Sequence, residues 1–434
     1  MKMTKYKLSE LVEVTRGASL SGQFYAEEGK LVRLTLGNFN MNGGGFKENT
    51  SKTDLYFTGT VRDEFILNEG DIITPLTEQS LGLLGTTARI PESGKYIQSQ
   101  DVALVRCKKG LLDPNFCYYL ISSSIVRQQL SAAAQQTKIR HTSPENIKDC
   151  TVWVPDFDVQ KNIGRILTDI DNKIAINRRI NDNLEAMAKQ LYDYWFVQFD
   201  FPNEEGKPYK SSGGAMVWNE KLKREIPQGW SISNVKSLIE PIERGISYSS
   251  DDLLDPFATP MINLACFSKA GDYRLGEMKF FSGKVSNDKL ISPMDMLIAC
   301  TDMTQGADII GRPILASDEY DQYTFSTDLA LITPKGKFKM YLYYTLRTPF
   351  YHKYIRPFAS GTTVKHLNLI GVENYGLPVP PIGIQSKFED LITPIKEKQS
   401  KNLNEINALT KQRDELLPLL MNGQASVNYH LSAC

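Results

Sequence analysis

Residues Gln160 to Phe196 read QKNIGRILTDIDNKIAINRRINDNLEAMAKQLYDYWF, and this stretch decides the fold. Counted in heptads, its a positions are Ile163, Ile170, Asn177, Leu184 and Leu191. Its d positions are Ile166, Lys173, Ile180, Met187 and Tyr194. Apolar residues repeating in this way predict a coiled-coil helix, about 60 Å long at 1.5 Å per residue. Such a stripe needs a partner to exclude water.

The chain contains a second copy of this pattern, 225 residues further on. The a positions of the second copy are Phe388, Ile395, Asn402, Leu409 and Leu416, and its d positions are Leu391, Lys398, Glu405, Gln412 and Leu419. We expect the two helices to pair, and antiparallel pairing is favoured because it needs no long return of the chain. Parallel pairing remains open, as does packing of each helix on its own domain. Antiparallel pairing would bring Asn177 and Asn402 near the pseudo-twofold axis, where a buried asparagine fixes the register. The alternative is that both side chains point to solvent.

The segments that precede the helices are also duplicated. Each half opens with a strand-like run and an Arg-Gly pair, and each closes with an extended segment that ends in proline. The matched pieces are Arg16-Gly17 with Arg244-Gly245, Val32–Phe39 with Pro260–Phe267, Ser99–Leu104 with Ser326–Leu331, Tyr118-Tyr119 with Tyr343-Tyr344, and Thr151–Pro155 with Gly376–Pro380. The order of elements therefore repeats, which predicts a pseudo-twofold architecture.

Short β-branched and aromatic runs between Gly, Ser and Asn clusters predict strands in each half, with helices at Pro114–Ala134 and Lys339–Ile355. The fold class is α+β: two similar domains separated by a pair of long antiparallel coiled-coil helices. We place the first domain at 1–155, a helix at 156–200, a polar surface linker at 201–228, the second domain at 229–381, a helix at 382–424 and a tail at 425–434. A length of 434 residues agrees with several domains.

Composition describes a globular protein. Hydrophobic residues make up 41% of the chain, which provides enough apolar surface for cores, and 50 basic residues balance 50 acidic ones. The zero net charge excludes a histone-like or polybasic protein. The six cysteines form no C-x-x-C pair and are interpreted as reduced thiols. The sequence shows neither a signal peptide nor an apolar span long enough for a bilayer, so we expect a cytoplasmic protein that does not enter membranes.

A search for chemistry finds no catalytic or metal-binding signature. The sequence lacks a Walker motif, G-x-S-x-G, and the N-P-P or D-P-P of an adenine methyltransferase. Gly43-Gly44-Gly45 lacks the strand and helix of a dinucleotide site, and no histidine lies at zinc-ligand spacing from a cysteine. Two similar domains held apart are better suited to recognising a ligand in two parts than to catalysing a reaction. A stand-alone DNA modification enzyme with a divergent active site, or a coiled-coil protein adaptor, remains an alternative.

The layout resembles the specificity subunit of type I restriction–modification systems over nearly the whole chain. Two domains are each followed by a long helix, and the residues after the first helix are similar to those of the family. The remaining residues that carry the resemblance are Leu8–Leu11, Phe199–Gly214, Arg224–Trp230 and Leu416–Gln424.

The resemblance implies that each domain is a target-recognition domain that reads one half of a bipartite site in double-stranded DNA. It also implies that the helices set the spacing and dock two modification subunits, which bind S-adenosylmethionine and methylate adenine N6. Restriction subunits would add ATP- and Mg-dependent translocation and cleavage. This chain itself would hold no cofactor or metal and would not be an enzyme.

Candidate DNA contacts are polar loop positions whose side chains suit bases or phosphates. Arginine can bind guanine O6 and N7, glutamine can bind adenine, and lysine mostly contacts phosphate. The candidates are Arg16, Arg33, Gln79, Lys138, Arg140 and His141 in the first domain, and Arg244, Tyr248, Gln305, Lys365 and His366 in the second. Lys138–His141 and Lys365-His366 fall at corresponding places in the repeat. For each candidate, an ordinary solvated surface residue is the competing interpretation.

Overall fold

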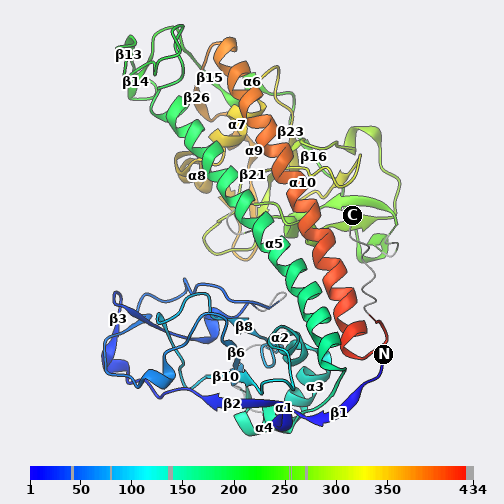
Figure 1. Ribbon diagram of the computed structural model, residues 1–434. Helices are drawn as coiled ribbons and strands as arrows, with labels where there is room; N and C mark the ends of the chain where they lie inside the picture. The colour runs from blue at the N-terminus through cyan, green and yellow to red at the C-terminus, as the bar shows by residue number, and fades with distance from the viewer. Residues whose placement is uncertain are drawn as a thin grey trace. The chain divides into compact units, whose positions relative to one another are not determined.

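The chain folds as two compact units, Met1–Ile174 with Leu409–Cys434 (unit 1) and Ala175–Ala408 (unit 2). The computed structural model describes residues 1–40, 44–78, 81–134, 140–253, 255, 257–268 and 272–426. Each unit combines strands and helices (Figure 1), so the α+β prediction is confirmed.

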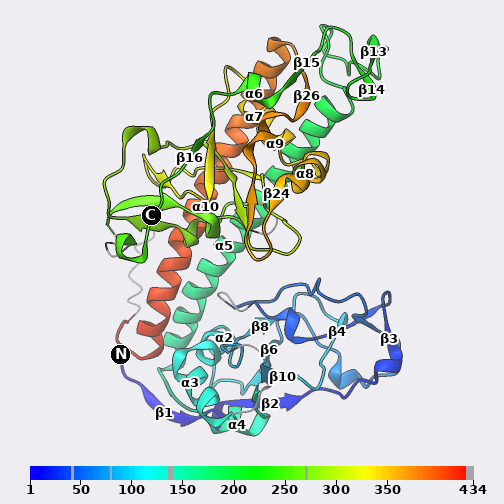
Figure 2. The same ribbon diagram turned by 180° about the vertical axis from the view of Figure 1, so that it is seen from behind.

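Unit 1 is built on a four-stranded antiparallel sheet in the order β2-β10-β6-β8. Its strands are β2 (Val12–Arg16), β10 (Val102–Cys107), β6 (Ile72–Pro75) and β8 (Ala88–Arg89). The second sheet contains β3 (Tyr25–Ala26), β5 (Tyr56–Phe57), β4 (Leu31–Arg33) and β9 (Tyr96–Ile97), and two strand pairs join β1 (Thr4–Lys7) to β12 (Thr151–Val154) and β7 (Thr77–Glu78) to β11 (Arg140–His141). The short helices are α1 (Leu8–Leu11), α2 (Pro114–Ser122), α3 (Ser124–Ala133) and α4 (Pro144–Asp149). Helices α2 and α3 lie beside β6 and β10 in both views (Figure 1 and Figure 2).

Unit 2 repeats this plan with the sheet β16-β23-β19-β21. Its strands are β16 (Glu243–Arg244), β23 (Leu329–Ile332), β19 (Met296–Ala299) and β21 (Pro313–Leu315). The other strands are β18 (Lys279–Phe281), β17 (Thr259–Ile262) and β22 (Thr324–Phe325) in one sheet, β20 (Thr301–Asp302), β25 (Lys365–Leu367) and β24 (Ala359–Ser360) in another, and the pairs β15 (Ser231–Asn234) with β26 (Gly376–Val379) and β13 (Met216–Asn219) with β14 (Arg224–Pro227). The short helices are α6 (Val235–Leu238), α7 (Lys339–Thr345), α8 (Pro349–Ile355) and α9 (Leu369–Glu373).

The repeat predicted from the sequence is confirmed in the strand pairing. β1 pairs antiparallel with β12, the last strand before the first long helix, and β15 pairs antiparallel with β26, the last strand before the second. A parallel pair also recurs, β4 with β9 and β17 with β22. The repeated Arg-Gly pairs have a steric reason: a Cβ added at Gly17 would lie 2.2 Å from the Gln98 carbonyl oxygen, and one at Gly245 would lie 2.1 Å from that of Phe325.

The two long helices are α5 (Phe157–Tyr192) and α10 (Ile382–Met421), and α5 continues into a π-helical turn at Asp193–Val197. They run antiparallel in both units. In unit 1, Arg413 Nη1 donates to Asp171 Oδ1 at 2.9 Å. In unit 2, Asn177 Nδ2 donates to Glu405 Oε2 at 2.7 Å, and Gln399 Nε2 donates to the Asn181 carbonyl at 2.9 Å. The antiparallel prediction is therefore confirmed.

The predicted a stripe lies inward, but the predicted d stripe is wrong. None of the ten a residues is exposed, whereas Ile180, Met187, Leu391 and Leu419 at d positions are exposed. The second row of the seam lies four residues after each a position, not three. Its members are Leu167, Ile174, Asn181, Ala188, Ile392, Gln399, Ile406, Arg413 and Leu420. The seam therefore includes the polar side chains of Asn181, Gln399 and Arg413, while four apolar side chains at d positions lie outside it.

Asn177 and Asn402 are both buried, but they do not bind each other. Asn177 donates to Glu405, and Asn402 Nδ2 donates to Asn181 Oδ1 at 2.9 Å. Because each amide is satisfied across the seam only when the helices hold this alignment, these pairs specify the register.

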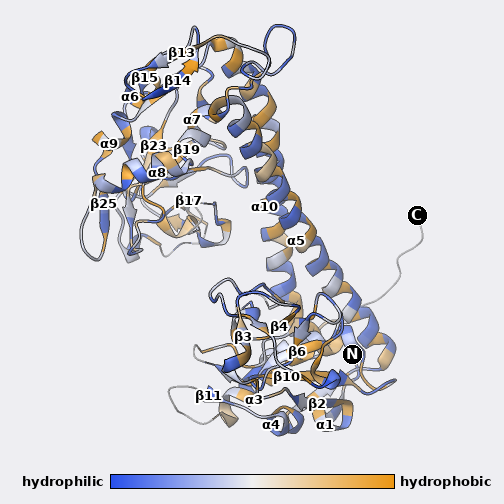
Figure 3. Cartoon of the chain, turned by 90° about the vertical axis from the view of Figure 1, so that its left-hand side faces the viewer, coloured by the Kyte–Doolittle hydropathy of each residue, from blue (hydrophilic) through white to orange (hydrophobic). Residues whose placement is uncertain are grey.

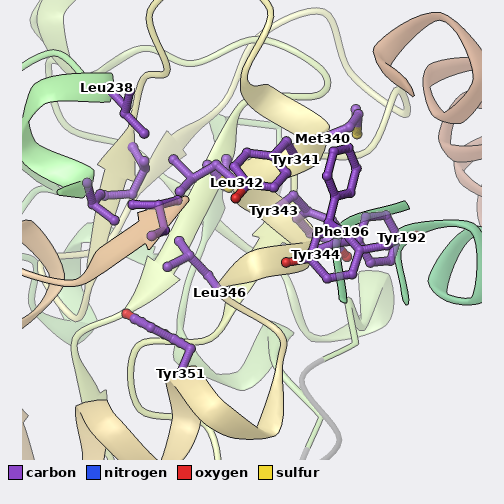
Figure 4. Packing of buried hydrophobic residues seen from close by; sticks show 14 of the residues in the cluster. Tyr192, Phe196, Leu238, Met340, Tyr341, Leu342, Tyr343, Tyr344, Leu346 and Tyr351 are labelled. Carbon is purple, nitrogen blue, oxygen red and sulfur yellow. The ribbon is translucent and has the colours of Figure 1, made fainter. Parts of the chain in front are cut away.

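The helices also form part of the core of each unit. Each helix therefore both pairs with the other and packs on its own domain. In unit 1, Ile163 and Leu167 pack with α2 and with Leu420 and Met421 of α10. In unit 2, an aromatic cluster joins α5, α7 and α10, and Figure 4 shows Tyr192 and Phe196 beside the tyrosines of α7. A bare helical spacer would lack such contacts.

Two local predictions are wrong. Each single helix expected after the central sheet is two helices: an extended Ser123 separates α2 from α3, and α8 starts anew at Thr348, whose side chain accepts from Tyr351 N. The linker prediction is wrong in part. Most residues of 201–228 lie at the surface, as expected, but Phe201 is buried beside Trp230, and β13 pairs with β14.

Along α5 and α10, hydrophobic and hydrophilic positions alternate (Figure 3), as expected for helices that bury one face. Within the described ranges, no helix combines the length and the apolar composition that crossing a membrane requires.

Candidate functional site

Each unit carries an antiparallel strand pair next to a loop, β7 with β11 in unit 1 and β20 with β25 in unit 2, where β24 adds a third strand. The two pairs occupy equivalent places in the repeat. In unit 1, β11 places Arg140 opposite Glu78 and His141 opposite Thr77. In unit 2, β25 places Lys365 opposite Asp302 and His366 opposite Thr301. The correspondence expected between these basic segments is thus present in the backbone pairing.

A buried carboxylate at the end of each pair holds the following loop. Glu78 Oε2 accepts from the backbone N–H groups of Gly82, Leu83 and Leu84 at 2.9 to 3.1 Å. Asp302 accepts from Thr304 N at 2.6 Å and from Ile309 N at 2.7 Å. Both carboxylates are almost inaccessible to solvent. Because several donors converge on each one, the loops have a defined shape.

Unit 2 contains a basic cleft of about 620 Å³ beside its strand pair. Six lysine and arginine side chains line it together with His352, and none of the described lining residues is acidic. The lining residues are Lys189, Ala307, Arg312, Arg347, Pro349, His352, Lys353, Arg356, Pro357, Ala359 and Lys365. A concentration of positive charge in a hollow favours a polyanion such as a nucleic-acid backbone.

The cations of the basic cleft differ in how far the protein already uses them. Lys189 pairs with Asp193, and Arg347 pairs with Asp272 at 2.9 Å. For the side chains of Lys353, Arg356 and Lys365, the described part of the chain supplies no ion-pair or hydrogen-bond partner. These three are the cations most available to a ligand.

His352 adds a polar group to the basic cleft without adding charge near neutral pH. Burial lowers the pKa of His352 below its ordinary value, and Arg312 and Arg356 lower it further, although the hydrogen bond to the Ala307 carbonyl acts in the opposite direction. His352 Nε2 lies 3.0 Å from that carbonyl oxygen. The positive charge of the cleft therefore comes from lysine and arginine.

The corresponding cleft of unit 1, about 630 Å³, has a mixed lining. Arg127 and Arg413 are accompanied by Glu78 and Asp414, and the rest is mainly Ser, Thr, Tyr and Gly. The two units share a framework but differ in the chemistry that they present.

Several sequence candidates lie in unit 2 near the basic cleft. Lys365 lines it, His366 is the next residue on β25 and is exposed, and Gln305 is exposed on the loop that also supplies Ala307 and Arg312. Arg244 lies on β16, where its Nε donates to the Thr327 carbonyl. Lys279 Nζ lies 3.2 Å from the Tyr248 hydroxyl and over its ring. Neither Arg244 nor Tyr248 is among the lining residues.

The unit 1 candidates are more dispersed. Arg16 is exposed at the end of β2, and His141 is exposed on β11. Arg33 is buried, pairs with Asp54 at 3.1 Å and stacks on Tyr25, and these contacts fit a structural role. The guanidinium of Arg140 pairs with the buried Glu78 at 3.0 Å, which also suggests a role in the fold. Gln79 and Lys138 lie outside the described residues.

Sequence reasoning missed the cations of α8 and the residue that follows it. Arg356 follows His352 by four residues and Lys353 by three, so its side chain lies on the same side of the helical segment as theirs. The signal was available in the run Tyr351-His-Lys-Tyr-Ile-Arg356, but no comparable run occupies the matching place in the first half.

Comparisons with known proteins agree on one family. Residues 1–186 match the model of the type I restriction modification DNA specificity domain. The type I restriction enzyme MjaIX specificity subunit of Methanocaldococcus jannaschii is 24% identical over 330 residues, which cover 74% of this chain and 71% of that protein. The HindI specificity subunit of Haemophilus influenzae is 20% identical over 385 residues, which cover 76% and 81%.

A solved structure has the same fold. The S subunit of a type I restriction–modification system from M. genitalium superposes with a TM-score of 0.64 at 16% identity, and the match covers 97% of this chain and 96% of that one. At this identity the likeness concerns the fold alone.

Proposed function

This chain belongs to the DNA specificity subunits of type I restriction–modification systems, and from that premise we propose that each of its units reads one half of a bipartite DNA site. As a specificity subunit, the chain recognises DNA sequence and is a non-catalytic component of its complex. The division into half-sites is the proposed part.

The proposal rests mainly on one observation: the same arrangement of strand pair, buried carboxylate and ordered loop recurs in both units. The pairs β7–β11 and β20–β25 each end in a buried carboxylate that orders a loop, and each sits beside a cleft. A two-stranded β-ribbon such as β7–β11 is narrow enough to enter the major groove, and in unit 2 the equivalent pair carries β24 as a third strand. Since the clefts are lined by different residues, the two units should prefer different sequences, and the composite site should be asymmetric.

The complex around this chain is proposed as follows. Two modification subunits carry S-adenosylmethionine and methylate adenine N6 at the site that the chain selects. Restriction subunits, where present, add ATP- and Mg-dependent translocation and cleavage. The complex acts in the cytoplasm, where the DNA is.

An apolar stripe on α5 supports docking of a protein partner. Ile176, Ile180 and Met187 are 38–54% exposed, and their spacing places them on one face of the helix. A groove of about 730 Å³ follows the helix from Ala186 to Gln198. Apolar side chains left exposed in a row on a long helix are typical of a surface that a partner covers. We assign this stripe to the modification subunit.

Mixing the purified chain with its modification subunit, S-adenosylmethionine and a random DNA library tests the proposal. We expect no methyl transfer by the chain alone, and transfer at one bipartite, asymmetric sequence when both proteins are present. Ile180→Glu with Met187→Glu should lower the amount of modification subunit that co-purifies by at least tenfold, because carboxylates would have to be buried without partners.

The matched control is Ile370→Glu, which adds a carboxylate at an exposed isoleucine of α9 and should leave co-purification unchanged. Methyl transfer by the isolated chain would instead identify a stand-alone enzyme. A stable complex without sequence preference would identify a protein adaptor.

A further inference from the structure

The loop between β20 and β21 presents a large apolar side chain to water. Met303 is 71% exposed, although it directly follows Asp302, which is fully buried. A single exposed methionine is not unusual in itself. Met303 is notable because of the ordered loop that carries it and the cations beside that loop.

The loop that carries Met303 is braced from several sides. Asp302 accepts from the N–H groups of Thr304 and Ile309, and Thr304 Oγ1 accepts from Asp308 N at 2.9 Å. The Ala307 carbonyl oxygen lies 3.0 Å from His352 Nε2. These contacts hold the loop in a shape that leaves Met303 exposed to solvent.

Met303 lies next to the cations of the basic cleft. Its neighbour Asp302 is paired in register with Lys365, and the same loop contributes Ala307 and Arg312 to the lining. A DNA backbone bound by these cations would bring base edges to the loop. The only apolar group on the major-groove edge of the bases is the 5-methyl group of thymine.

Unit 1 has a similar loop beside its cleft, although the lining of that cleft is mixed and not basic. Glu78 holds the N–H groups of Gly82, Leu83 and Leu84, and on the same loop Leu81 is 78% exposed. Leu81 follows its carboxylate by three residues and Met303 follows by one, so the two loops are equivalent although the residues are not aligned. Two independent loops thus present an apolar side chain beside an ordered strand pair.

We propose that Met303 and Leu81 are specificity-determining residues, each of which contacts the 5-methyl group of a thymine in its half-site. The inference rests on the proposed function, because it presupposes that both units read DNA. It adds an apolar contact to the polar contacts expected from the strand pairs.

Deoxyuridine substitution tests the contact, because it removes the thymine methyl group and leaves every hydrogen-bonding group in place. The probe is the recognition site with each thymine replaced singly, and the protein is the chain assembled with its modification subunit. We expect one thymine in each half-site whose replacement weakens binding by about fourfold, the effect of one buried methyl-sized group.

Substitution of Met303 or Leu81 should abolish the effect of deoxyuridine on binding in one half-site each. Met303→Ala should bind the thymine and deoxyuridine sites equally at one position and leave the other half-site unaffected, whereas Met303→Leu should retain the preference. Leu81→Ala should act on the other half-site. Ile382→Ala, at an exposed isoleucine at the start of α10, serves as the control and should change nothing.

Each outcome decides one question. Wild-type binding that is unaffected by deoxyuridine at every position, or a half-site without thymine, overturns the contact. So does Met303→Ala that retains the wild-type thymine preference. A rise in 2-aminopurine fluorescence next to the loop would show insertion between base pairs instead. Absence of any sequence preference in the wild-type complex would overturn the proposed function itself, which keeps the two failures distinct.

Discussion

Replacing Lys353 and Arg356 together with glutamine is expected to weaken binding of the assembled complex to its DNA site roughly 30-fold at 0.15 M salt. These two cations line the basic cleft and lack partners in the described part of the chain, so their charge is available to phosphates. Each phosphate contact releases about one counterion, which corresponds to roughly a fivefold change in affinity at this salt concentration. The measurement is the binding constant over a range of salt concentrations.

The slope of log K against log salt should become less steep by about two for the double variant. Base preference should remain, because phosphate contacts carry no sequence information. Lys210→Gln with Lys221→Gln removes the same charge from exposed positions of the linker and should leave the slope unchanged. An unaltered slope in the cleft variant would show that DNA does not bind there.

Lys396→Met is expected to destabilise unit 2 by about 3 kcal/mol, the usual cost of breaking a buried ion pair from one side. Lys396 is 7% exposed, pairs with Glu185 across the helix seam and lies over the rings of Tyr343 and Tyr344. Without it, the cationic partner that remains for the carboxylate of Glu185 within the described ranges is Arg347, at 3.6 Å. Tryptophan fluorescence during urea unfolding measures the change, since Trp195 and Trp230 lie in this core.

The same variant predicts a dependence on pH. Burial raises the pKa of Glu185, but Lys396 and Arg347 outweigh it and hold the pKa below its ordinary value. The pair therefore stabilises the protein above the pKa of the unfolded state, and this stability is lost as pH falls through the lower folded value. In Lys396→Met, Glu185 has lost one of its two cationic partners, so burial raises the pKa of Glu185 in the folded state. Protonation of Glu185 then removes the buried negative charge.

The stability difference between wild type and Lys396→Met should accordingly be largest near pH 7 and shrink toward pH 4. Lys398→Met, at an exposed position two residues along α10, is the control and should have little effect at either pH. Equal unfolding midpoints for wild type and Lys396→Met at pH 7 would contradict the structural role of this pair.

The repeat and the helix pair could be predicted from the spacing of apolar residues. The sequence did not predict which residues form the second row of the seam between the two helices. Ile180 and Met187 are apolar and therefore attracted the d assignment, yet they are exposed, whereas Asn181 and Glu185 face the partner helix. Those polar residues are satisfied by groups that come from distant segments, and a local pattern does not contain them.

The candidate site shows the same limit. The correspondence of Arg140 with Lys365 was visible in the sequence, and the strand pairing reproduces it. The ion pair that links Arg140 to Glu78 was not visible, because the partners are 62 residues apart and the burial of Glu78 depends on the loop it holds. The basic cleft likewise gathers residues from Lys189 to Lys365, and only three-dimensional packing brings them together.

The central claim is that two equivalent units each read one half of the DNA site. The most direct test exchanges residues 229–381 for the matching segment of a relative with a different target, and sequences the methylated positions in a host that also produces the modification subunit. We expect one half of the methylated sequence to change while the other half remains. A change in both halves, or methylation that does not follow the exchange, would contradict it.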